Sequence, residues 1–239
     1  MTVQAIGQVT EQQQVVKNIY YLTIAVPEIA CLAKPGQFVQ VKCSESYTPL
    51  LRKPFSLHWI DQKAGTISLL YEVKGHGTKL LSEFQVGASI DLLGPLGKGF
   101  TLPEMSGRAL LVGGGMGIAP LLPLAGELKE QKQEFTVILG FNDASRVCRQ
   151  EAFSELGGQV VITTVDGSRG EKGLVTKPLA KELETGNYDL VYACGPEVML
   201  KKVVELAERY GVECQVSLEA YMACGFGACL GCTCTTKTQ

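Results

Sequence analysis

The sequence predicts an all-β domain followed by an α/β domain: an antiparallel β-barrel, then a doubly wound parallel sheet, then a cysteine-rich segment. Three observations lead to this prediction. Short β-type runs separated by turns extend to about residue 99, and strands alternate with helical patterns around a glycine loop at 113–117. The run 224–232 then spells C-x4-C-x2-C. We place the three parts at residues 1–100, 101–211 and 212–239.

The composition excludes several classes of protein. The chain has 239 residues, 46% of them hydrophobic and 19% charged, and its net charge of −2 offers no basic face for nucleic acid. No apolar run reaches the ~18–20 residues of a membrane span, and the N-terminus lacks the features of an export signal, so we expect a cytoplasmic protein. The cysteine count is odd, at nine, and three of these residues form a C-x4-C-x2-C cluster, which indicates reduced thiols around a metal rather than disulfides.

Five strands are expected in the barrel, at 20–26, 38–42, 55–60, 66–73 and 89–93. The one helix expected there covers 77–84. The stretch 94–100 contains four glycines and prolines, and the hydrophobic period changes after it, so we expect an interdomain hinge.

The stretch Arg52-Lys53-Pro54-Phe55-Ser56 has the composition of a flavin-binding strand. A cation can meet a pyrophosphate, the aromatic ring can pack on the flavin, and the serine can hydrogen-bond its edge near N5. The alternative is a solvated basic pair that leads into a core strand.

The stretch 71–78 is a second candidate for phosphate binding. Gly77 and Thr78 open the expected helix, so its free N–H groups could bind a phosphate. The alternative is a glycine loop that only turns the chain, and His76 reads as a loop residue.

A nucleotide site is expected at the start of the α/β domain. The apolar strand 109–112 feeds a loop that contains Gly113, Gly114, Gly115 and Gly117, and the helix 121–130 follows. A strand, glycine loop and helix in this order present N–H groups to a pyrophosphate. A tight turn between strand and helix is the alternative.

The rest of the α/β domain repeats this alternation. Strands are expected at 135–140, 160–165 and 190–193, and helices at 150–156, 175–183 and 197–210. Ligands of such folds bind beyond the carboxyl ends of the strands. Asp166 could accept a ribose hydroxyl there or simply form a turn, and Cys194 could be an inert buried thiol.

The spacing of Cys224, Cys229 and Cys232 matches three ligands of a plant-type [2Fe–2S] cluster. A zinc knuckle is disfavoured because zinc sites pair C-x2-C units or use histidine, and His58 and His76 lie far upstream. The fourth ligand is open: Cys234, a distant thiol, or a residue beyond Gln239. Residues 235–239 contain no closing structural element, which favours a chain that is truncated before that ligand.

These motifs together resemble the ferredoxin–NADP⁺ reductase superfamily over about residues 3–211. The resemblance rests on the flavin motif at 53–56, the loop 113–120 and the sequence Cys194-Gly195-Pro196. With the cluster loop included, the chain is similar to the electron-transfer subunits of class B dihydroorotate dehydrogenases.

This resemblance implies FAD, NAD(H) and one [2Fe–2S] cluster, and a partner subunit whose FMN oxidises dihydroorotate to orotate in pyrimidine biosynthesis. It implies a heterotetramer of two copies of each subunit. FAD would be held by the flavin motif together with Leu70, Tyr71, Glu72, Gly77 and Thr78. Ser56 and Cys194 would be the catalytic positions, with Gly195 and Pro196 at the nicotinamide. Arg52 and Lys53 are both candidates for the pyrophosphate contact, because Lys53 aligns with the basic position of the family motif and Arg52 lies directly before it.

The cofactors suggest their own order. NAD⁺ accepts only a hydride and a [2Fe–2S] cluster carries one electron, so a flavin that does both must stand between them. We expect electrons to pass from the partner's FMN through the cluster and FAD to NAD⁺. NAD is expected rather than NADP, although Arg146 and Arg149 leave the choice open.

Two other functions are compatible with parts of the sequence. One is the reductase subunit of a hydrogenase or another redox complex that uses NAD(P)H. The other is a non-catalytic iron–sulfur redox-sensing module, which would need neither the flavin motif nor the glycine loop.

Overall fold

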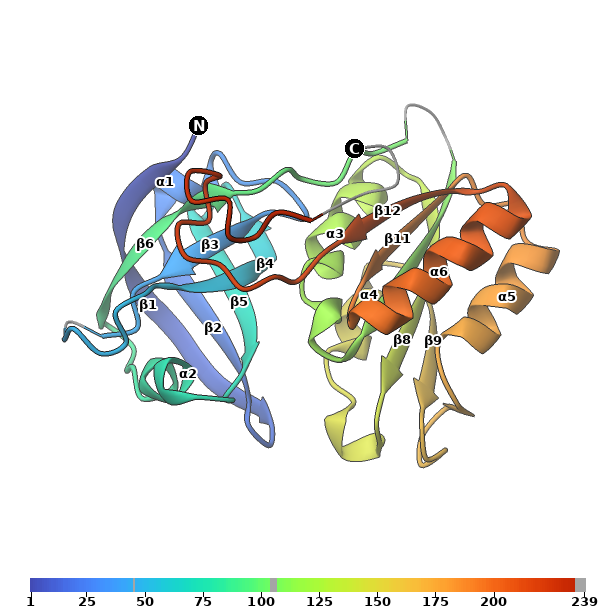
Figure 1. Ribbon diagram of the computed structural model, residues 1–239, viewed down its shortest axis with the longest axis horizontal. Helices are drawn as coiled ribbons and strands as arrows, with labels where there is room; N and C mark the ends of the chain where they lie inside the picture. Colours follow the sequence, from blue (N-terminus) through green and yellow to red (C-terminus); the bar gives the residue numbers. More distant parts are fainter. Residues whose placement is uncertain (45, 104–106, 235–239) are drawn as a thin grey trace.

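The computed structural model describes residues 1–44, 46–103 and 107–234. Two domains lie side by side, and the segment 218–234 returns from the second domain to the first (Figure 1). The ending at 235–239, expected to lack a closing element, lies outside the described residues. No helix in the described ranges is long and apolar enough to cross a membrane.

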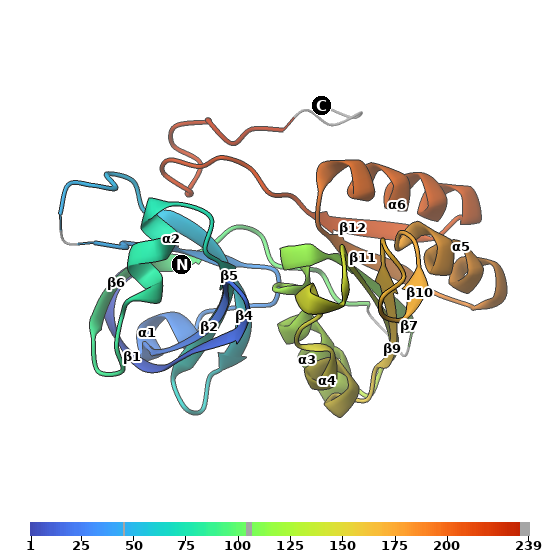
Figure 2. The same cartoon turned by 90° about the horizontal axis from the view of Figure 1, so that it is seen from below.

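The first domain is a closed six-stranded barrel, seen nearly end-on in Figure 2. Its strand order is β1-β2-β5-β4-β3-β6, and every pairing is antiparallel. Leu22, Leu57 and Leu69 are fully buried in its core. The strands are β1 (Val3–Val16), β2 (Ile19–Ala25), β3 (Phe38–Val41), β4 (Lys53–Asp61), β5 (Thr66–Glu72) and β6 (Ser89–Leu96).

The second domain is a six-stranded parallel sheet of order β10-β9-β8-β7-β11-β12. Its strands are β7 (Arg108–Gly114), β8 (Glu134–Phe141), β9 (Gln159–Thr164), β10 (Glu171–Lys172), β11 (Leu190–Cys194) and β12 (Glu213–Ser217). The helices are α3 (Leu121–Glu130), α4 (Gln150–Glu155), α5 (Thr176–Thr185) and α6 (Glu197–Tyr210), with short 3-10 turns at Gly115–Ile118 and Ala144–Arg146.

Strand β7 shows why the sequence of a strand in this sheet is a continuous apolar run. Ala109 and Leu111 join the core under α3 and α4, whereas Leu110 and Val112 join the core under α5 and α6. Helices cover both faces, so every position on the strand needs an apolar side chain. The structure therefore confirms the predicted barrel and doubly wound domain.

Several sequence-based expectations were wrong in detail, and the strands β1, β10 and β12 were not expected. The barrel carries a second short helix, α1 (Pro27–Ala30), besides α2 (His76–Ser82). The expected hinge at 94–100 begins too early, because β6 continues to Leu96 and pairs with β3. The sheet also passes the expected boundary at residue 211, since β12 pairs with β11. The cysteine segment therefore begins after Ser217.

A buried histidine joins the two domains. The Nε–H of Arg149 donates to Nε2 of His58 at 3.1 Å, so Nδ1 of His58 carries the proton and donates to the carbonyl oxygen of Ala119, also at 3.1 Å. The Arg149 guanidinium lies 4.7 Å from the ring centre of Tyr21. Burial, followed by the Arg149 charge, lowers the pKa of His58 to about 3. A neutral histidine thus fixes the barrel against the glycine loop.

Candidate functional site

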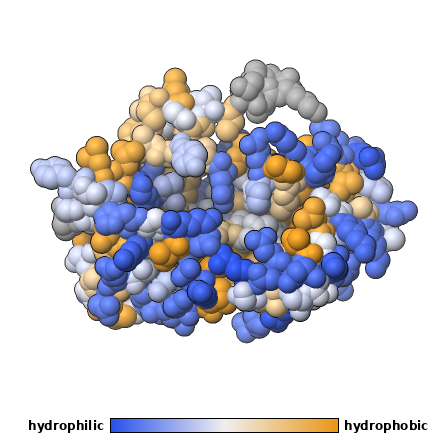
Figure 3. Space-filling view, turned by 60° about the horizontal axis from the view of Figure 1, so that its bottom comes forward, coloured by the Kyte–Doolittle hydropathy of each residue, from blue (hydrophilic) through white to orange (hydrophobic). Residues whose placement is uncertain are grey.

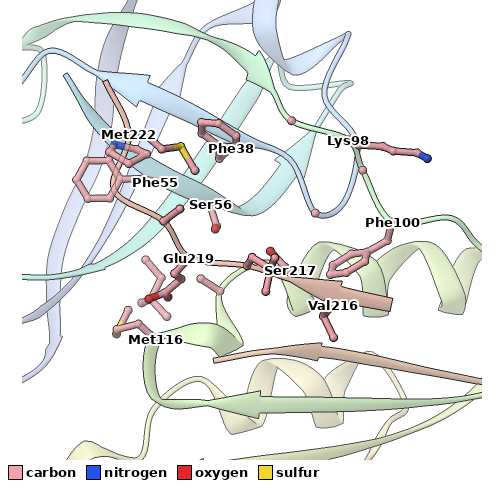
Figure 4. Close-up of a pocket in the computed structure, with 18 of the residues that line it drawn as sticks. Phe38, Phe55, Ser56, Lys98, Phe100, Met116, Val216, Ser217, Glu219 and Met222 are labelled. Carbon is pink, nitrogen blue, oxygen red and sulfur yellow. The ribbon is translucent and has the colours of Figure 1, made fainter. Parts of the chain in front are cut away.

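A cavity of about 820 Å³ opens where the barrel, the interdomain connection and the segment after β12 meet (Figure 4). Its apolar lining residues include Phe38, Phe55, Phe100, Met116, Val216 and Met222. Ser56 adds a hydroxyl on the barrel side. We call this space the flavin cavity, because a slot lined by aromatic, thioether and hydroxyl side chains fits a flat, conjugated ring.

The barrel register builds the inner wall of the flavin cavity. Ser56 on β4 pairs with Phe38 on β3, so both residues come to the same edge of the barrel. Phe55 packs on Tyr71 of β5, with 5.4 Å between the ring centres. The predicted residues Pro54, Leu70 and Glu72 also line the cavity. Strand pairing thus unites the two predicted flavin stretches, which are about fifteen residues apart in sequence.

The two basic residues of the flavin motif have different surroundings. Arg52 donates to the Asp91 carboxylate at 2.6 Å and to the Asp91 carbonyl at 2.9 Å, so it is held by β6. Lys53 instead lies against Gly77: a Cβ on that glycine would come within 3.0 Å of the Lys53 chain. Thr78 stabilises the same turn, because its Oγ1 accepts N–H groups from Lys74 and Gly75.

A second cavity, of about 830 Å³, lies at the carboxyl ends of the parallel strands. Gly114 and Gly115 of the glycine loop contribute to it, with Asn142 after β8 and Pro196 before α6. This is the position at which doubly wound sheets bind nucleotides, and we call it the nucleotide cavity. The predicted loop is therefore at the predicted edge of the sheet.

Gly117 brings the glycine loop against the end of β11. A Cβ at this position would lie 2.2 Å from the carbonyl oxygen of Cys194, so a side chain does not fit. Gly113 is similarly packed on Ile118, while Gly195 lies against Met199. These glycines shape the nucleotide cavity by close backbone approach.

Cys194 is not positioned as a reactive thiol. Its side chain is buried, and burial raises its pKa to about 12. It is absent from the walls of both cavities in the part of the chain that the structure describes. This placement corresponds to the inert buried cysteine that the sequence left open.

Three charged residues near the nucleotide cavity are already engaged. Asp166 is exposed and accepts the Ser168 N–H at 2.9 Å and hydroxyl at 2.6 Å, which is the turn-forming role. Arg146 pairs with Glu72 of the barrel, and Arg149 with His58. Neither arginine therefore presents a free guanidinium to a 2′-phosphate.

Four residues border both cavities: Glu72, Lys74, Met116 and Glu219. Burial acts to raise the pKa of Glu72, but hydrogen bonds from Lys74 and Arg146 outweigh it and lower that pKa. Glu219 lies in the segment after β12, and Figure 4 shows it near Met116 and Ser56. Glu219 belongs to no sequence motif and was not predicted, because only the path of the chain brings it here.

The cysteine loop curls its backbone around one sulfur. The N–H of Cys229 donates to Sγ of Cys224 at 3.4 Å, and Gly225, Gly227 and Leu230 adopt positive φ to allow this turn. Backbone N–H groups of Cys229 and then Phe226 lower the pKa of the Cys224 thiol to about 6. Within residues 1–44, 46–103 and 107–234, no three metal-binding side chains already converge.

The cysteine loop nevertheless fits an iron–sulfur cluster. Three thiols at ligand spacing and N–H groups aimed at sulfur are the donors that such a group needs. Cys234 is exposed near the third cysteine, with its Sγ 3.8 Å from the Cys232 carbonyl, and stays a candidate fourth ligand.

Comparison with known families agrees with this geometry. The model of the oxidoreductase NAD-binding domain matches residues 111–205. The model of the iron-sulfur cluster binding domain of dihydroorotate dehydrogenase B matches residues 219–239. With the reductase fold, these matches support NAD, a [2Fe–2S] cluster and FAD as the cofactors.

A solved structure of an NADH-dependent reduced ferredoxin–NADP oxidoreductase has a TM-score of 0.86 and 32% identity, covering 95% of this chain and 81% of that one. The ferredoxin reductase of carbazole 1,9a-dioxygenase shares the fold, with a TM-score of 0.78 and 19% identity over 90% of this chain and 69% of that one.

Curated relatives are similar over most of the chain. The electron transfer subunit of dihydroorotate dehydrogenase B (NAD(+)) from Desulforamulus reducens is 41% identical over 91% of this chain and 83% of its own length. The subunit of the same name from a Geobacillus species is 43% identical over 95% of this chain and 87% of its own length. This chain therefore belongs to the family of electron-transfer subunits of dihydroorotate dehydrogenase B.

Proposed function

We propose that this chain is the NAD-linked electron-transfer subunit of a cytoplasmic dihydroorotate-oxidising enzyme that serves pyrimidine biosynthesis. Its partner would be a catalytic subunit that carries FMN, in a heterotetramer with two copies of each. The names of the relatives support an oxidoreductase of this kind with a catalytic partner.

One observation carries the proposal: the flavin cavity borders the other two sites. It shares Met116 and Glu219 with the nucleotide cavity, and Met222, two residues before Cys224, forms part of its wall. A flavin bound there supplies the conversion between hydride and single-electron transfer. This arrangement supports a flavin site between the nucleotide site and the cluster site.

Individual residues have separate roles in this proposal. Phe55, supported from the barrel core by Tyr71, packs on the ring system of FAD, and Ser56 offers its hydroxyl to the ring edge. Lys53, rather than Arg52, meets the pyrophosphate, because Arg52 is committed to Asp91. The glycine loop and Pro196 bind NAD(H).

The exposed face of the cysteine loop is the proposed contact with the catalytic subunit. Phe226 is 60% exposed and Leu230 69% exposed, and Tyr221 before the loop is fully exposed. Figure 3 shows apolar side chains gathered on the raised segment beside the grey trace. An apolar surface at the redox centre suits a permanent subunit interface, which also shortens the distance that electrons travel.

The test combines spectroscopy with reconstitution. The purified chain should show flavin absorbance over a broad iron–sulfur background, and anaerobic NADH should bleach the flavin. Mixed with the FMN-containing catalytic subunit, it should reduce NAD⁺ in the presence of dihydroorotate, whereas neither subunit should do so alone. A colourless, folded chain that cannot be reloaded with FAD and ignores NADH would refute the assignment.

A second candidate is the reductase subunit of another redox complex. It is supported by the 32% identity to the NADH-dependent reduced ferredoxin–NADP oxidoreductase. Purification of tagged chain from its own cells distinguishes the two, because this candidate predicts a partner that does not oxidise dihydroorotate.

A further inference from the structure

The side-chain amide of Gln40 on β3 is fully buried in the barrel, and neither its Nε2 nor its Oε1 has a hydrogen-bond partner among the described residues. A buried amide left unpaired costs about 1–3 kcal/mol of free energy. Such a group calls for a partner that this cofactor-free chain does not itself supply.

The Gln40 amide lies directly under the cysteine loop. A Cβ added to Gly225 would come within 2.7 Å of Gln40 Nε2 and 3.1 Å of its Cγ, so this glycine rests on the glutamine side chain. Gly225 has a φ of +75° and follows Cys224, the first ligand position. The loop therefore approaches the barrel at this amide.

The cluster site suits the amide better than the flavin cavity does. Phe38, two residues earlier on β3, lines the flavin cavity, but Gln40 does not. Sγ of Cys224 already accepts one N–H, from Cys229, and sulfur around iron accepts several. A side-chain NH2 buried against the neighbouring glycine is placed to add another.

We propose that Gln40 is a positioning residue for the iron–sulfur site, donating its Nε2–H to sulfur on the Cys224 side of the loaded loop. This inference rests on the iron–sulfur assignment made above. Reduction adds negative charge to the cluster, and a hydrogen bond to sulfur stabilises that charge, so Gln40 raises the reduction potential. Gln40 also pairs with Pro54 in the β3–β4 ladder, so it links the cysteine loop to β4, the strand that carries the flavin motif.

The test is a redox titration of the cluster, followed by electron paramagnetic resonance in the anaerobic chain. In Gln40→Leu and in Gln40→Met, which is similar in length but has no donor, iron content should match the unmodified chain. The midpoint potential of the cluster should fall by about 59 mV in each variant, which is a tenfold shift of the one-electron equilibrium toward the oxidised cluster. The matched control is Gln12→Leu, since the Gln12 amide already donates to the Leu81 carbonyl at 2.8 Å. Its cluster potential should not change.

The apo chain gives a second readout. Gln40→Leu removes an unpaired buried amide, so without iron it should unfold at equal or higher urea concentration than the unmodified chain. Unchanged potentials in both Gln40 variants at full iron content would overturn the inference and leave the proposed function intact. A chain that binds no iron under any reconstitution would overturn the inference, and one that also takes up no FAD and ignores NADH would overturn the proposed function as well.

Discussion

Buried His58 makes the free energy of unfolding of the chain depend on pH. The pKa of His58 is about 3 in the folded chain and 6.5 as its ordinary value. As the pH falls below about 6.5, the unfolded chain takes up this proton while the folded chain does not. The stability that neutral His58 contributes is therefore complete above that pH and is lost progressively toward pH 3.

The size of this loss follows from the difference between the two pKa values. Each pH unit in this window corresponds to about 1.4 kcal/mol, so the step from about 6.5 down to pH 5 removes about 2 kcal/mol. His58 is fully buried, so solvent does not screen the effect. Protonation would also place a second cation beside Arg149, 3.1 Å away.

Urea unfolding followed by circular dichroism at pH 7 and pH 5 measures this effect in the reduced apo chain. His58→Leu should be less stable at pH 7 by about 1–3 kcal/mol, because Ala119 and Arg149 lose a partner. Between pH 7 and pH 5, the free energy of unfolding of this variant should fall by about 2 kcal/mol less than that of the unmodified chain. The control, His76→Gln, alters the other histidine, which is exposed, and should keep the full pH dependence. Equal pH dependence in the chain with and without His58 would refute the reasoning.

Three further outcomes are expected at the cofactor sites. Gly117→Ala places a Cβ 2.2 Å from a backbone oxygen, so it should raise the KM for NADH about tenfold or more while flavin content stays unchanged, as steady-state kinetics and absorbance will show. Lys53→Ala should weaken FAD binding about tenfold in a titration, whereas Arg52→Ala should lower the melting temperature and leave FAD affinity near normal. Glu72→Gln should release Arg146 and raise the NADPH-to-NADH ratio of kcat/KM about three- to tenfold, measured with an artificial electron acceptor.

The α/β domain was the more predictable half of the fold. Its central strands β7, β8 and β11 are buried on both faces, so each is a nearly continuous apolar run that sequence alone reveals, as in Leu110 and Leu111. The last strand, β12 (Glu213–Ser217), was missed because it lies at the sheet edge and its burial pattern is mixed. Edge strands carry a weaker pattern, since one side pairs with no neighbour.

The barrel was predicted in type but less well in detail. The polar run Glu11-Gln12-Gln13-Gln14 lies inside β1, where most of these side chains face solvent while the backbone pairs with β2. Half-buried antiparallel strands depend on this pairing more than on composition. Lys53 and Arg52 were likewise indistinguishable in sequence, because only the fold brings Asp91 to Arg52.

The meeting of the two cavities could not be predicted from any one stretch. Glu72, Met116 and Glu219 come from the barrel, the glycine loop and the segment after β12, and only the closed fold brings them together. Chain length then constrains the cluster. Cys224 lies seven positions after Ser217, the end of β12, and an extended chain of that length spans at most about 25 Å. That short segment also lines the flavin cavity, so the chain path keeps Cys224, the first proposed cluster ligand, close to that cavity. In the proposed function, the order of cluster, flavin and nucleotide therefore follows from topology as well as from cofactor chemistry.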